Sequence, residues 1–338
     1  MLPMFLRWLA ILSAAAVAVA ATRPPYGGTL RVEIEALVET ADPPQIGPGM
    51  GDLNGAFSVT RWEGGRTAVY SANENAPGGR PFLDSVEIQM GRPLRDQAID
   101  VELKQADVVE LGPNEARRAG VSRKTWTSAP VRVLMLVFSG RVSDARIREA
   151  LALAVDRSAI HTVLLQRQGE VTAALLPQWI SGYAFLFPTA PDLGKARNLA
   201  STESPQSRVL TLSFDDPGLR PIAERIAVNA RDVGLAVSVS PRNGGAEIRL
   251  VEERIVDEQP SRALAGLAAV LKLPQPARAE TPEELYAAER ALLDGFRVIP
   301  LFHLPDVYGV NPRVKGGTGI NPLGQWRFSD LWLETVRP

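Results

Sequence analysis

The sequence predicts an α/β protein with enough chain for one large or two ordinary domains. Its 338 residues are 45% apolar, which is enough to bury a sizeable core. Val209–Phe214 has the pattern of a strand, an amphipathic helix follows from Leu219 to about Gly234, and Leu235–Ser240 has the pattern of the next strand. A strand, a helix and a strand at this spacing predict a βαβ unit with a parallel strand pair.

The N-terminal segment, residues 1–21, has the features of a Sec-type signal peptide. Arg7 adds positive charge, residues 8–21 are apolar, and Ala18-Val19-Ala20 fits a cleavage site. A retained membrane anchor is the alternative, but the run is shorter than the roughly 20 apolar residues of a spanning helix. We therefore expect an exported mature protein that begins at Ala21 or Thr22.

The first half of the chain alternates strand patterns with turn signals. Gly27–Ile34 predicts a strand, and the Gly- and Pro-rich segment from Asp42 to Gly55 predicts a linker. Ala56–Ser71 alternates apolar and polar residues, as a hairpin does. Gly78-Gly79 predicts a tight turn before a strand at Glu87–Gln89.

A helix pair is predicted at the centre of the chain. Ser143 or Asp144 can cap the first helix, and Asp156–Ser158 can cap the second, with Gly169 just beyond it. The apolar residues between the caps recur at helical spacing: Ile147, Ala150, Leu151, Ala154, Ile160, Val163 and Leu164. Periodicity alone indicates only that one face of the pair is buried.

Strand and helix signals continue to the C-terminal end. Ala246–Val251 predicts a strand, whereas Gln259–Glu280 is rich in Ala and Pro and lacks a clear pattern. Thr281–Glu284 is a capping box with Pro at the first helical position, so a helix should begin there and reach Gly295. Arg297–Phe302 predicts the strand that follows.

Composition and motif searches argue against most other classes. Net charge is −1 and aromatic content is 6%, so neither a basic surface nor a stacking platform indicates nucleic-acid binding. The chain has no cysteine and its two histidines, His161 and His303, have no ligand spacing around them. Gly47–Gly51 lacks the Gly-Lys-Ser/Thr of a nucleotide loop, and no G-x-S-x-G or H-E-x-x-H occurs. We expect no catalysis, cofactor or metal.

One stretch, VFSGRVSDARIREALALAVDRSAIHTVLLQRQGEVTAALLPQWISGY at Val137–Tyr183, resembles a known family. Family-5 extracellular solute-binding proteins, the dipeptide and oligopeptide receptors of ABC importers, carry a similar "VRQAL-AIDR-I" helix pair and "LP…GY" loop. Further patches in the family's order resemble its "GGTLRVA", "NPDYWGGKPYLDEV", "ALQSGEVDVAEL" and "APVIPLF" segments: Gly27–Ile34, Asn73–Val86, Ala98–Leu111 and Arg297–Phe302. The linker at residues 43–55 replaces a long subdomain of the family.

The resemblance implies a two-lobed, periplasmic-binding-protein-like α/β fold. Mixed sheets flanked by helices would form each lobe, with a ligand cleft between the lobes. Lobe I would comprise residues 22–138 and a C-terminal return at 304–338, and lobe II residues 139–303, with crossovers near Ser139 and His303. The family function would then be capture of a short peptide or similar small solute, with hinge closure presenting it to an ABC importer permease.

We therefore expect a monomer that works in the periplasm or outside the cell and serves peptide transport across the membrane. The alternative is a degenerate receptor that no longer carries solute and acts as an envelope interaction protein.

Five residues are candidates for ligand binding. Four aromatic residues lie in segments whose family counterparts approach the cleft, although simple core is the favoured position for each taken alone: Trp126, Phe138, Trp179 and Tyr183. Peptide-binding relatives place an Asp in a "W-ADYPDP" segment, and the corresponding LVEERIVDEQPSR offers Asp257 without the Trp and Tyr. Asp257 is thus a candidate anchor for a cationic ligand group, with a solvated loop charge as the alternative.

Overall fold

The computed structural model describes residues 24–38, 53–122, 124–183, 185–241 and 244–334. The expected signal peptide at residues 1–21 and most of the expected linker, including Gly47–Gly51, lie outside the described residues. Within the described part of the chain, no helix is long and apolar enough to cross a membrane.

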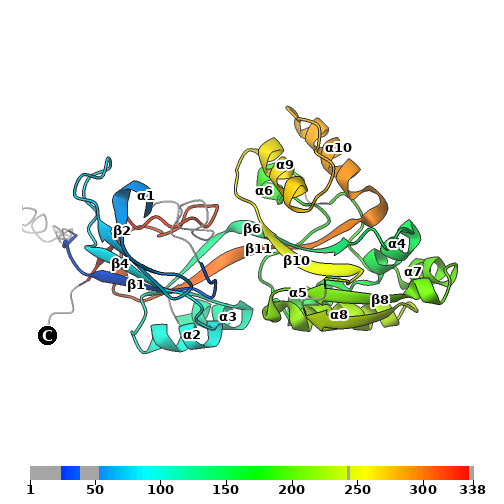
Figure 1. The fold of residues 1–338 in the computed structure, drawn as a ribbon, viewed down its shortest axis with the longest axis horizontal. Helices are drawn as coiled ribbons and strands as arrows, with labels where there is room; N and C mark the ends of the chain where they lie inside the picture. The colour runs from blue at the N-terminus through cyan, green and yellow to red at the C-terminus, as the bar shows by residue number, and fades with distance from the viewer. Residues whose placement is uncertain (1–23, 39–52, 123, 184, 242–243, 335–338) are drawn as a thin grey trace, which may run out of the picture.

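Two bodies, joined by the long strands β6 (Lys124–Phe138) and β11 (Val298–Val310), make up the molecule (Figure 1). The first half contains α1 (Leu53–Ala56), α2 (Leu94–Glu102), α3 (Pro113–Ser122), β1 (Thr29–Glu33), β2 (Phe57–Glu63), β3 (Thr67–Ala72), β4 (Ser85–Gln89) and β5 (Val108–Glu110). The short strands β12 (Val314–Lys315) and β13 (Trp332–Leu333) pair with each other near the C-terminal end.

The second half contains most of the helices. They are α4 (Ala145–Ala154), α5 (Arg157–Val163), α6 (Gln178–Ser181), α7 (Leu193–Ser201), α8 (Arg220–Arg231), α9 (Pro260–Val270), α10 (Pro282–Leu293) and the short turns η1 (Gln206–Arg208), η2 (Pro217–Leu219) and η3 (Asp294–Phe296). Its strands are β7 (Glu170–Val171), β8 (Val209–Phe214), β9 (Ala236–Pro241) and β10 (Ile248–Arg254).

The larger sheet forms one hydrogen-bonded path through both halves, in the order β2-β3-β4-β1-β5-β11-β6-β10-β8-β9, with β7 beside β11. Separate sheets for the two lobes were expected, but β6 and β11 are long enough to pair with strands of both. The predicted βαβ unit is confirmed, because β8 and β9 pair in parallel from Val209↔Ala236 to Phe214↔Pro241 with α8 between them.

Side-chain alternation along β6 builds the second half in layers. Leu134, Leu136 and Phe138 pack in the core under α4, α5 and α8, whereas Val133 and Met135 pack in the core under α9 and α10. Successive residues of a strand point to opposite faces, so helices cover both faces of this part of the sheet (Figure 1). The first half has its own core around Trp126, Tyr70 and Trp326.

The chain passes between the halves inside β6 and β11. Residues 133–138 pack in the second half, so the boundary expected after Phe138, with its crossover at Ser139, falls too late in the chain. On β11, Leu304 packs in the second-half core and Tyr308 in the first-half core, so this crossing lies just after His303.

A pair of prolines marks the crossing itself. Pro305 of β11 faces Pro130 of β6, and the register of the two strands shifts on both sides of Pro305. Proline has no N–H to donate to the ladder, and irregular register lets a strand bend. The strands can therefore bend where the two halves meet, at what we call the Pro130–Pro305 hinge.

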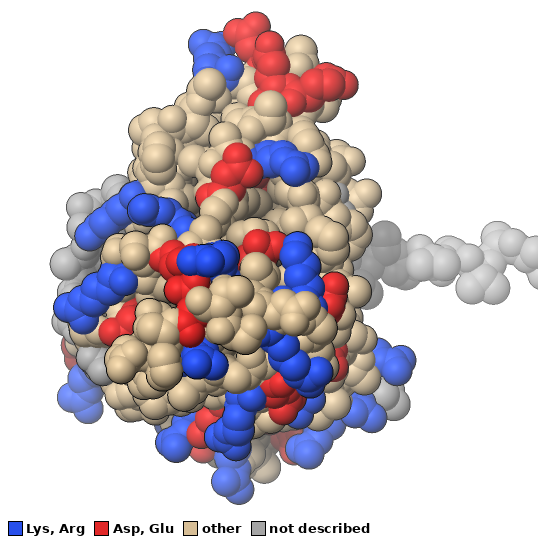
Figure 2. All heavy atoms as spheres, turned by 90° about the vertical axis from the view of Figure 1, so that its right-hand side faces the viewer, with Lys and Arg blue, Asp and Glu red and all other residues tan. Residues whose placement is uncertain are grey.

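Local capping follows the sequence closely. The Asp144 carboxylate accepts a hydrogen bond from the Arg146 N–H at 2.8 Å, and Asp156 accepts one from the Ala159 N–H at 2.9 Å. The capping box of Thr281 and Glu284 is present at the start of α10. Over the end of the second half, basic and acidic side chains lie interspersed (Figure 2), as the near-zero net charge suggests.

Candidate ligand pocket between the two halves

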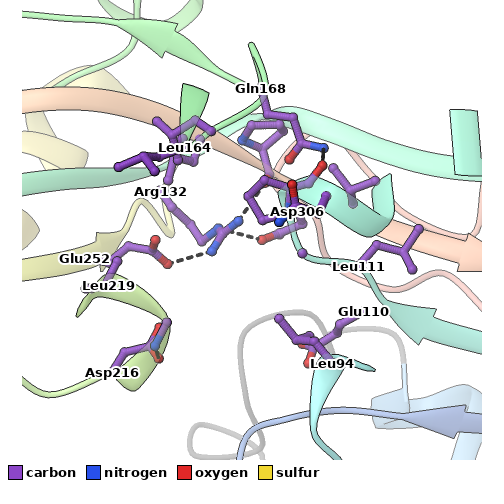
Figure 3. Close-up of a pocket in the computed structure, with 18 of the residues that line it drawn as sticks. Leu94, Glu110, Leu111, Arg132, Leu164, Gln168, Asp216, Leu219, Glu252 and Asp306 are labelled. Atoms are coloured by element: carbon purple, nitrogen blue, oxygen red, sulfur yellow. Dashed lines mark hydrogen bonds and ion pairs between the residues drawn. The ribbon is translucent and has the colours of Figure 1, made fainter. Parts of the chain in front are cut away.

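A cavity of about 390 Å³ lies between the two halves, on the side of the sheet that carries α2, α3, α5 and α8. The first half contributes the segment after β1, the end of β5 and the starts of α2 and α3, and the second half contributes the end of α5, η2 and the start of α8. Parts of β6, β10 and β11 complete the lining (Figure 3).

Strand direction explains why loops converge here. β1 runs parallel to β5 in the first half, and β8 runs parallel to β10 in the second, and the segments that follow β1, β5 and β8 enter the lining. In open α/β sheets, ligands bind in the crevice outside the carboxyl ends of such strands. Two hydrogen bonds bridge the halves nearby, from Arg117 to Gln166 at 2.5 Å and from Gln168 to the Pro113 carbonyl at 3.4 Å.

Arg132 lies in the wall of the pocket, and its guanidinium is paired with two carboxylates. Its Nη1 pairs with Glu252 Oε1 at 2.6 Å, its Nε lies 3.1 Å from Asp306 Oδ1, and its Nη2 donates to the Pro305 carbonyl at 2.7 Å. Burial alone would lower the pKa of Arg132, but Glu252 and Asp306 raise it above its ordinary value. Arg254 contacts Asp306 as well, so β6, β10 and β11 are tied together beside the hinge.

Carboxylates outnumber cations in the lining. Five of the side chains there are acidic, Glu35, Glu110, Asp216, Glu252 and Asp306, and one is basic, Arg132. Glu252 and Asp306 are paired with arginines.

The other three carboxylates form no salt bridge within the described part of the chain. Glu110 Oε2 accepts the Glu35 N–H at 2.6 Å. Burial raises the pKa of Glu110, and this hydrogen bond offsets part of the rise.

Glu35 and Asp216 line the pocket from opposite halves. Partial burial raises the pKa of the Glu35 carboxyl, and the negative charge of Asp216 raises it further. Asp216 also caps η2, since its Oδ1 accepts the Gly218 N–H at 2.7 Å. The rest of the lining is largely apolar and includes Leu94, Leu111, Leu164, Leu219, Ile222 and Leu304. Apolar walls with a few fixed polar groups are what small-molecule pockets offer.

None of the five sequence-predicted ligand residues lies in this lining. Trp126 is 2% exposed in the first-half core, and Phe138 is buried in the second-half core. Trp179 is 40% exposed and its Nε1 donates to the Pro130 carbonyl at 2.9 Å. The Tyr183 hydroxyl donates to Glu289 Oε2 at 2.6 Å.

Asp257 is paired with a neighbouring arginine. Arg262 reaches its carboxylate through Nε at 2.7 Å and Nη2 at 3.1 Å, and the Gln259 N–H donates to it at 2.8 Å. The Arg262 hydrogen bonds hold the pKa of Asp257 below its ordinary value. A role for these five residues in binding stays a prediction; Trp179 lies in α6 and Tyr183 just after it, and the other three lie in other parts of the chain.

A family model described as bacterial extracellular solute-binding proteins, family 5, matches residues 7–271, which is more than half of the chain. The chain belongs to this family. No curated protein sequence matches it.

Solved structures similar to this family-5 chain share its fold. The murein tripeptide-binding protein MppA of Escherichia coli has a TM-score of 0.70 at 16% identity, over 83% of this chain and 64% of MppA. The oligopeptide-binding protein AppA of Bacillus subtilis, solved with a nonapeptide, has a TM-score of 0.68 at 14% identity, over 83% and 66%. NikA of Staphylococcus aureus, solved with Ni(L-His)2, has a TM-score of 0.68 at 13% identity, over 82% and 68%.

Together the family match and these likenesses confirm the predicted two-lobed α/β fold. The chain spans about two thirds of the length of these solved relatives.

Sequence reasoning missed the pocket carboxylates, although a signal was present. Glu110 is the last residue of β5, within the Ala98–Leu111 patch that resembles the family, and Asp216 follows the predicted Val209–Phe214 strand by two residues. Acidic residues just after parallel strands of a solute-binding fold are candidates for the cleft. That both line one pocket could not be inferred, because 106 positions separate the two residues.

Proposed function

We propose that this family-5 protein captures a small organic solute, with a short peptide as the first candidate, in the pocket between its two halves. The observation that carries this proposal is the pocket itself. It draws on both halves, has apolar walls and fixed carboxylates, and lies beside the Pro130–Pro305 hinge. A solute held there contacts both halves at once, which favours a closed arrangement over an open one.

Delivery to the permease of an ABC importer is the second part of the proposal. The protein would act as a monomer in the periplasm or outside the cell, and the closed, loaded form would dock on the permease. Membership of an extracellular solute-binding family supports this role. Peptide ligands are supported by solved relatives such as AppA with its nonapeptide and a Pseudoalteromonas dipeptide-binding protein with Met-Leu.

A thermal-shift screen of the mature protein with di- and tripeptides, sugars and metal chelates tests the ligand class. We expect peptides to raise the melting temperature in a concentration-dependent way, because a ligand that binds only the folded state stabilises it by mass action. Stabilisation by sugars or chelates alone would replace the peptide with another solute class.

The shortened chain keeps one alternative open, a receptor that acts as an envelope interaction protein without carrying solute. It is favoured by coverage of only 63–68% of the solved relatives, which leaves less surface to frame a long ligand. Absence of stabilisation by every solute in the screen would support this alternative and contradict solute capture.

A further inference from the structure

We infer that the pocket selects solutes that carry a positive charge, with Glu110 as the anchor and with Glu35 and Asp216 as further carboxylates of the lining. This inference rests on the proposed function and adds the charge of the ligand and the residues that bind it. It differs from the sequence-based expectation, in which Asp257 held the cationic group.

The first argument is that some carboxylate oxygens of Glu110 and Glu35 have no donor from the described residues. Glu110 Oε2 receives the Glu35 N–H, and no described residue donates to Glu110 Oε1 or to the Glu35 carboxylate. Both carboxylates line the cavity, Glu35 exposed and Glu110 half-buried, so both are accessible to the donors of a ligand. An ammonium or guanidinium group donates charge-assisted hydrogen bonds to carboxylates, and these bonds are stronger than bonds between neutral groups.

The second argument is that the charge of Arg132 is already paired within the protein. Its Nη1 and Nη2 donate to Glu252 and the Pro305 carbonyl, and its Nε lies 3.1 Å from Asp306 Oδ1, so its charge is already paired with two carboxylates. An anion in the pocket would meet five carboxylates and one guanidinium that is already neutralised. Like charges in a partly desolvated cavity repel, so the same lining that attracts cations discriminates against anions.

The third argument is that the unpaired carboxylates of the pocket belong to both halves. Glu35 and Glu110 belong to the first half, and Asp216 belongs to the second. Movement about the Pro130–Pro305 hinge changes the distance between them. Their repulsion opposes closure in the empty protein, and a cation between them removes it, so the charge of the ligand is coupled to closure.

Calorimetric titration with dipeptides of different charge tests the inference. The probes are Ala-Lys amide, which is cationic, N-acetyl-Ala-norleucine amide, which is neutral and similar in shape, and Ala-Glu, which carries a net negative charge. Agmatine serves as a cation that is not a peptide. We expect Ala-Lys amide to bind at least about tenfold more tightly than the neutral probe, and Ala-Glu to bind most weakly.

Two conservative variants locate the anchor. Glu110→Gln keeps an acceptor for the Glu35 N–H, and Asp216→Asn can still cap η2. Glu110→Gln should weaken the binding of Ala-Lys amide by about tenfold to a hundredfold, and Asp216→Asn should weaken it by less. Neither variant should change the affinity for the neutral probe. Glu87→Gln on β4, outside the lining, is the matched control and should leave all titrations unchanged.

The outcomes separate the inference from the proposed function. Equal binding of the cationic and neutral peptides, unchanged in Glu110→Gln, overturns the inference and leaves peptide capture standing. Binding of agmatine without any peptide overturns peptide capture and supports selection of cations. Loss of Ala-Lys binding in Asp257→Asn but not in Glu110→Gln moves the anchor to Asp257 and overturns the assignment, and no binding of any probe overturns both.

Discussion

Replacement of Glu289 tests most sharply how the 172–183 loop is held. Glu289 on α10 is fully buried, and its Oε1 accepts the N–H groups of Leu175 and Leu176 while its Oε2 accepts the Tyr183 hydroxyl. Glu289→Ala leaves two buried backbone donors without an acceptor, at about 1–3 kcal/mol each. We therefore expect a loss of about 2–6 kcal/mol in the free energy of unfolding.

Glu289→Gln separates charge from hydrogen bonding. Burial raises the pKa of Glu289 from 4.5 to about 7, so the folded protein holds a proton that the unfolded chain releases. The stabilisation from this proton is fully present below pH 4.5 and is lost as pH rises to about 7, a change of about 3 kcal/mol. Glutamine cannot titrate, so the variant should lack this component of the pH dependence.

Urea unfolding followed by circular dichroism at several pH values between 4.5 and 7.5 measures both effects. Tyr183→Phe, which removes one donor and leaves two, is the matched control and should lose about 1–3 kcal/mol. A loss below about 1 kcal/mol in Glu289→Ala, or the same pH slope in the Gln variant as in the wild type, would refute this account of the loop.

Three further substitutions test the fold. Gly169→Ala should lower the free energy of unfolding by about 2 kcal/mol or more, because Gly169 has a φ of 71° and a Cβ there would overlap the His303 carbonyl oxygen. A change near zero would contradict the packing of β7 against β11. Trp126→Ala should lower the free energy of unfolding by about 3–5 kcal/mol in the same assay, because it removes a large side chain from the core. A smaller loss would favour a position in the cleft wall over one in the core. Asp257→Ala should change stability by less than about 1 kcal/mol, since its pairing with Arg262 is a surface ion pair, and a thermal melt showing a larger loss would give that pair a structural role.

Local chemistry in the sequence predicted much of the fold. The caps at Asp144, Asp156 and Thr281 need only a few neighbouring residues, and each is present. The βαβ unit from Val209 to Ser240 also follows from short-range periodicity. The crossing between the halves could not be located in this way, because β6 continues in regular alternation past Pro130, and which core each residue joins depends on distant helices.

The residues of the ligand pocket could not be predicted from the sequence for a related reason. Glu35 meets Glu110 only because β1 pairs with β5, and Asp216 joins them only through the arrangement of the two halves. For Trp126, the sequence left core and cleft wall open as alternatives, since both environments bury large aromatic area. The structure places it in the first-half core, with its ring closely covered by Gly319.

Blocking the pocket tests the central claim that solute binds between the two halves. Asn114 is an exposed residue of the lining at the start of α3, and Arg118 is an exposed residue of the same helix outside the lining. Calorimetric titration of Ala-Lys amide into Asn114→Trp should show binding at least about tenfold weaker than in the wild type, whereas Arg118→Trp should bind as the wild type does. Undiminished binding in Asn114→Trp, with its melting temperature unchanged, would place the solute elsewhere and contradict the claim.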